Sequence, residues 1–118
     1  MPQPVDLVRF VQFSDGTAPG LTTLVELFVA NTTEALEDLA AAIGSGMPAD
    51  IERVAHRAAG STAACGAGRL GELLSELERV AQQGGTERAA DLLSEIAAEA
   101  ARVCEFLRQT IRRESEPA

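Results

Sequence analysis

Four long stretches of the sequence repeat apolar residues every three or four positions, and short glycine-rich breaks separate them. This spacing puts the apolar side chains on one face of an α-helix. We predict helices at about residues 19–43, from 48–50 to the glycines at 66 and 68, at 67–83 and at 86–112. None of them can bury its apolar face alone, so the predicted fold is all-α, an antiparallel up-down four-helix bundle.

The N-terminal segment, residues 5–13, is ambiguous between helix and strand, because both periodicities find apolar side chains there. We predict a short helix that caps one end of the bundle. The 118 residues are expected to form one domain, with loose tails at about residues 1–4 and 114–118.

The chain is acidic: 18 Asp and Glu residues oppose 10 basic residues, all of them Arg, for a formal net charge of −8. Most of such a surface would repel phosphate backbones, so we exclude nucleic acid as the main partner. The sequence has no run of about 18 apolar residues and no signal-peptide pattern. These features predict a cytoplasmic protein with no membrane partner.

The two cysteines, Cys65 and Cys104, form no C-x-x-C pair. Together with a single histidine they cannot supply the four ligands of a structural zinc site, so we expect no metal site. We predict that both are reduced thiols in the core.

His56, the single histidine, is predicted to point away from the core. At about 100° per residue, the apolar positions of its helix fall within an arc of roughly 100°. His56 lies on the opposite side, one turn before Gly60, where its neighbours are too small to cover it. A neutral imidazole that is open to another macromolecule can act as a nucleophile near neutral pH. The residues of the apolar arc are Ile51, Val54, Ala55, Ala58, Thr62 and Cys65.

The pattern Ala55-His56-x-x-x-Gly60-Ser61, followed by Gly66-Ala67, Leu70 and Leu77-Glu78, resembles the histidine-containing phosphotransfer (HPt) domain of multistep phosphorelays. The resemblance implies that His56 is a phosphoacceptor that carries a phosphoryl group between receiver-domain aspartates, without autonomous kinase activity. It also implies that the partner is a receiver domain, a hybrid histidine kinase or both. The chain would need no cofactor of its own, because the receiver supplies magnesium, and we expect a monomer.

Several further residues are candidates for the same site. The resemblance implies that Glu78 accepts a hydrogen bond from imidazole Nδ1, with Gln82 as an alternative and a solvated glutamate as the plainer interpretation. HPt domains usually carry a lysine three residues after the histidine, where this chain has Ala59, and the chain contains no lysine. Arg53 and Arg57 are candidates to replace that lysine. Ser61 is a candidate phosphate contact, although it can equally bond its own helix backbone.

A glycine inside a helix costs about 1 kcal/mol relative to alanine, and access to His56 would explain Gly60. The small residues around His56 predict a shallow docking surface for the receiver, which we expect the next helix to extend. Two other functions stay open: an HPt-like adaptor that binds a receiver or kinase without carrying phosphate, and an acid-base enzyme, for which no second catalytic group is evident. The predicted docking residues are Ala59, Gly60, Ala63, Ala64, Gly71 and Ser75.

Overall fold

Residues 3–115 of the chain are described by a computed structural model, with side chains up to residue 113. The described chain is helical and contains α1 (Leu7–Val11), α2 (Ala18–Ser45), α3 (Pro48–Ala64), α4 (Gly68–Gln82) and α5 (Thr86–Ser115). The four predicted long helices and the short N-terminal helix are therefore confirmed. Of the predicted tails, residues 1–2 and 116–118 lie outside the described part. Residues 114–115 belong to α5, which is longer than predicted.

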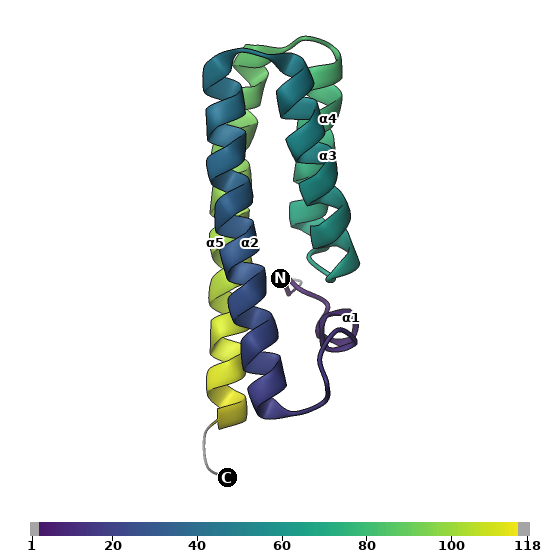
Figure 1. The fold of residues 1–118 in the computed structure, drawn as a ribbon, viewed down its shortest axis with the longest axis vertical. Coiled ribbons are helices and arrows are strands. Elements are labelled where there is room, and N and C mark those ends of the chain that lie inside the picture. Colours follow the sequence, from purple (N-terminus) through teal and green to yellow (C-terminus); the bar gives the residue numbers. More distant parts are fainter. Residues whose placement is uncertain (1–2, 116–118) are drawn as a thin grey trace.

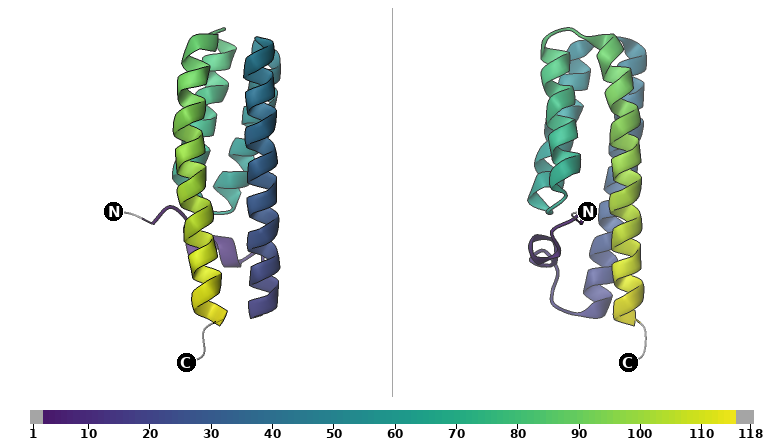
Figure 2. Two further views of the ribbon diagram at one scale, coloured as in Figure 1. Left: turned by 90° about the vertical axis from the view of Figure 1, so that its left-hand side faces the viewer. Right: turned by 180° about the vertical axis from the view of Figure 1, so that it is seen from behind.

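The four long helices run alternately up and down, and α5 closes the bundle against α2 (Figure 1). The bundle is uneven, since α2 and α5 have 28 and 30 residues while α3 and α4 have 17 and 15. The α3–α4 hairpin therefore packs against one half of the α2–α5 pair only. Figure 2 shows α1 in the space that the shorter hairpin leaves open. This is the predicted capping position.

The core lies between the apolar faces of the helices, as the periodicity predicts. Leu27 is an exception: the 3.6-residue spacing includes it in the buried stripe of α2, yet its exposed fraction is 56%. No helix within residues 3–115 has the length and apolarity needed to cross a bilayer. The largest fully buried core side chains are Phe10, Leu39, Ile51, Leu70, Leu77, Leu92, Ile96 and Leu107.

Local chemistry sets the ends of the helices. The Thr17 hydroxyl accepts a hydrogen bond from Gly20 N–H and caps α2, and Gly46 ends that helix in the left-handed region with φ of 70°. Gly66 joins α3 to α4 with φ of 89°, and its carbonyl accepts a hydrogen bond of 2.9 Å from Asp6 N–H. A Cβ on Gly66 would lie 2.6 Å from Asp6 O. Only glycine therefore satisfies both the backbone angle and the contact that holds the N-terminal segment under the hairpin.

The α3–α4 pair has the most extensive contact of the bundle. Gly71 of α4 faces Ala63 of α3 so closely that a Cβ on Gly71 would lie 3.2 Å from the Ala63 Cβ. The small residues at this crossing allow the two helices to approach, and the candidate site lies along the same seam.

Candidate functional site

His56 lies in the middle of α3 and projects into solvent, with 76% of its side chain exposed. The periodicity of α3 orients it: Val54, Ala55 and Ala58 point into the core, which leaves the imidazole on the outer side. The outward projection that the sequence predicts is therefore confirmed.

Glu78 of α4 holds the inner edge of the ring, because His56 Nδ1 and Glu78 Oε2 are 2.8 Å apart. The carboxylate is positioned by its neighbour Leu77, which is fully buried, and only 21% of the Glu78 side chain is exposed. A carboxylate only accepts hydrogen bonds, so in a neutral imidazole the proton of this bond belongs to Nδ1. The lone pair is then on Nε2, the ring nitrogen that faces solvent. This is the contact that the sequence predicts for Glu78.

Gln82 does not contact His56. Its side-chain amide donates to Glu52 Oε1 at 3.1 Å, one helical turn farther along the same seam. The alternative prediction, that Gln82 orients the imidazole, is therefore wrong. Glu52 is not among the residues predicted from the sequence, although its position four residues before His56 places it on the same face of α3.

One antiparallel register connects these contacts. Relative to the His56–Glu78 pair, Glu52 lies four residues back on α3 while Gln82 lies four residues ahead on α4. In the other direction, Ala63 lies seven residues after His56 on α3, and Gly71 lies seven residues before Glu78 on α4. The close contact of small residues and the two polar contacts thus share one alignment of α3 with α4.

The two candidate arginines, one turn apart on α3, differ in their relation to the imidazole. Arg53 lines a shallow depression with His56 and Glu78, and its guanidinium is 3.8 Å from the Asp50 carboxylate. Both arginines line a second depression on the α2 side, with Asp38 among its residues, but Arg57 does not line the one around His56. Of the two, only Arg53 shares a surface with the imidazole.

Ser61 is also on the α2 side of α3. Its hydroxyl donates to Ala58 O at 3.2 Å, the plainer of the two interpretations that the sequence left open. It lines the pocket between α2 and α3 rather than the His56 depression. Ser61 therefore does not lie beside His56, where a contact with the phosphoryl group would require it.

The predicted docking surface is smaller than expected. Gly60, Ala63, Ala64 and Ser75 are exposed, but Ala59 is only 7% exposed and Gly71 is buried. The physical reason is the close approach of α4, which widens the buried arc of α3 to about 140°, from Val54 to Ala59. Gly71 forms the floor of a groove between the helices, and Ser75 lies at its side.

Cys65 is half-buried and Cys104 is buried, and both are free thiols. Burial raises the pKa of both thiols, although Arg108 partly opposes this for Cys104. Among the described residues, no three His, Cys, Asp or Glu side chains gather where they could hold a metal ion.

Comparisons with known proteins agree with this geometry. The family model described as "Hpt domain" matches residues 23–110. The crystal structure of histidine-containing phosphotransfer protein B (HptB) from Pseudomonas aeruginosa PAO1 superposes with a TM-score of 0.86 at 26% sequence identity, covering 96% of this chain and 98% of that one. A search of curated proteins found no significant match.

Proposed function

Since the chain belongs to the Hpt domain family, we propose that it carries a phosphoryl group on His56 between receiver-domain aspartates of a two-component phosphorelay. One observation carries the proposal: an imidazole that is 76% exposed is held through Nδ1 by a carboxylate, with Nε2 toward solvent. This arrangement suits a nucleophile that a second protein must reach.

In the proposed reaction, the Nε2 lone pair attacks the phosphorus atom of an aspartyl phosphate on the receiver. A P–N bond forms, and the P–O bond to the aspartate breaks with its electron pair going to the departing carboxylate. The imidazole becomes a cation that keeps its Nδ1 proton, and the Glu78 carboxylate stabilises it. The reverse step, attack by an aspartate carboxylate of a receiver, returns the electron pair to Nε2.

We expect this chain to contribute no metal ligand and no kinase activity, with magnesium bound by the receiver. The receiver would dock over the exposed small residues of α3, where Gly60 leaves space: nothing lies within 4 Å of a Cβ placed on it. Arg53 is the cation best placed to approach the phosphoryl oxygens, because it lines the same depression as the imidazole.

One observation favours a second candidate, an adaptor that binds a receiver or kinase without carrying phosphate. The usual lysine position is Ala59, which is buried, and the depression around His56 contains two carboxylates, Glu52 and Glu78, but one cation. Like charges beside a phosphoryl group disfavour its transfer to this surface.

The deciding experiment incubates the protein with a radiolabelled phosphorylated receiver domain and magnesium. The carrier function predicts acid-labile, alkali-stable label on the wild type and none on His56→Gln, which keeps a side chain of similar length. Arg57→Gln is a matched surface variant and should accept label normally. A receiver that binds but transfers no label would contradict the carrier proposal and support the adaptor.

A further inference from the structure

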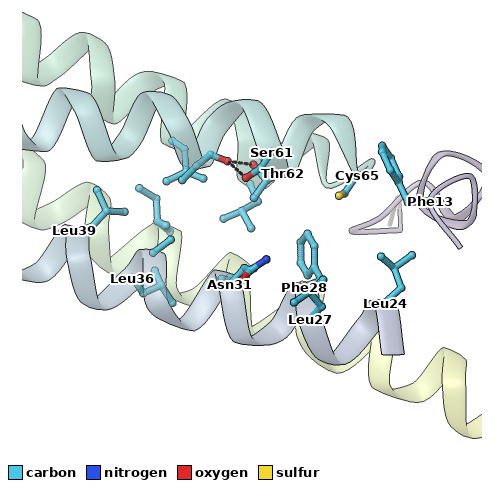
Figure 3. A pocket seen from close by; sticks show the side chains of 17 residues that line it. Phe13, Leu24, Leu27, Phe28, Asn31, Leu36, Leu39, Ser61, Thr62 and Cys65 are labelled. Atoms are coloured by element: carbon cyan, nitrogen blue, oxygen red, sulfur yellow. Dashed lines mark hydrogen bonds between the residues drawn. The ribbon is translucent and has the colours of Figure 1, made fainter. Parts of the chain in front are cut away.

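A second concave site lies on the opposite side of α3 from His56. Between α2 and α3 there is a cavity of about 180 Å³, with α4 and α5 contributing to its walls (Figure 3). Its walls are mainly aliphatic and aromatic side chains, and it shares no residue with the depression around His56. The walls include Leu24, Phe28, Leu36, Leu39, Leu74 and Ile96.

The polar groups of this cavity are poorly suited to hold water. The Ser61 hydroxyl donates to Ala58 O, and the Thr62 hydroxyl donates to the same carbonyl at 2.9 Å, so both protons stay within α3. Figure 3 shows these bonds along the cavity wall. Thr32, a buried residue of α2, also lines the cavity, and so does Asn31, an exposed residue whose side-chain amide is drawn in Figure 3. An ordered water needs two to four polar partners, and most of the lining side chains are apolar and offer none.

The cavity opens to solvent along the gap between α2 and α3. Leu27 of α2 and Phe13, which follows α1, lie at one end of it and are 56% and 57% exposed. The position of Leu27 accounts for its departure from the buried stripe: it stands at the opening rather than in the packed core. A molecule can therefore enter without unfolding of the bundle.

We propose that this cavity binds a small, mainly apolar molecule, with one aromatic ring or a short alkyl chain. Its volume decides the size class, because a dry cavity of about 150 Å³ lined by similar side chains is large enough for benzene. The mainly apolar walls, with few polar side chains among them, decide the chemistry, since a ligand with several polar groups would leave most of them without partners. Binding is independent of His56, which lies on the other face of α3.

The test uses toluene as the probe and methyl-detected NMR of the full chain. We expect saturable shifts at the methyl groups of Leu36, Leu74 and Ile96, and none at Val8, which is exposed on α1. At ten times its dissociation constant, toluene should raise the folding equilibrium constant about elevenfold, which corresponds to about 6 °C in Tm. His56→Gln should bind toluene equally well.

Ala35→Leu on α2 fills the cavity from its wall and should abolish the shifts, whereas Ala30→Leu, an exposed alanine outside the cavity, should keep them. If Ala35→Leu fails to fold, the proposal is judged from the methyl shifts of the wild type, at the lining residues against Val8. The proposal is overturned if toluene at its solubility limit produces no saturable shifts, or if Val8 shifts as much as the lining residues. It is also overturned if the wild type dimerises through Phe13 and Leu27 so that the opening is closed by a second copy.

Discussion

Gly60 allows stability and partner access to be separated by substitution. It lies inside α3, its φ is not in the left-handed region, and nothing lies within 4 Å of a Cβ placed on it. Alanine should therefore fit without strain and remove the entropic cost of glycine, raising the free energy of unfolding by about 1 kcal/mol. For a chain of this length that is about 4 °C in Tm. The isolated protein thus gains nothing from a glycine here.

A longer side chain at the same position should act in the opposite sense on transfer. Gly60→Gln adds bulk without charge beside His56, and bulk forced into a well-packed interface costs about 1–3 kcal/mol, or roughly a fivefold to 150-fold loss of transfer rate. The assay combines urea denaturation with the initial rate of phosphoryl transfer from a receiver. Gly44→Gln is the matched control, because Gly44 is another helical glycine with open space around it. Unchanged transfer in Gly60→Gln would refute the docking argument, and a destabilised Gly60→Ala would refute the structural one.

Five further outcomes test other parts of the structure. Glu78→Gln should keep the fold but slow transfer about tenfold or more, because a neutral amide stabilises the imidazolium less than a carboxylate does; an unchanged rate would argue that Glu78 has no orienting role. Gly71→Leu should push α4 away from α3, and loss of the imidazole hydrogen bond, followed by ¹⁵N NMR of the ring, is the expected sign. Glu99 has 8% of its side chain exposed and, within the described part of the chain, one carboxylate oxygen without a hydrogen-bond partner, so Glu99→Leu should raise the free energy of unfolding in urea by about 1 kcal/mol. The raised thiol pKa values of Cys65 and Cys104 predict slow labelling of native protein by thiol reagents at pH 8. Because the folded state holds these protons more tightly, their contribution to stability should fall as the pH rises above the ordinary thiol pKa of 9.0.

The helices and the direction of His56 could be predicted from sequence, because helical periodicity is a local property. The same periodicity misplaced Ala59 and Leu27. It describes one helix at a time, whereas burial depends on how closely the neighbouring helix approaches: α4 covers Ala59, and a gap beside α2 exposes Leu27. The pairing of Gln82 with Glu52 could not be foreseen either, since it depends on the register between two helices.

That register connects the fold to the chemistry. The Ala63–Gly71 contact lies seven residues from the His56–Glu78 pair on each helix, so any slip of α4 along α3 would separate the imidazole from its carboxylate as well as the two small residues. Gly66 fixes the start of this alignment, because the turn that it forms determines where α4 begins relative to the end of α3. A side chain at Gly66 or Gly71 would therefore act on the imidazole without touching it. The glycines of the hairpin are as much a part of the candidate site as the residues that would meet the phosphoryl group.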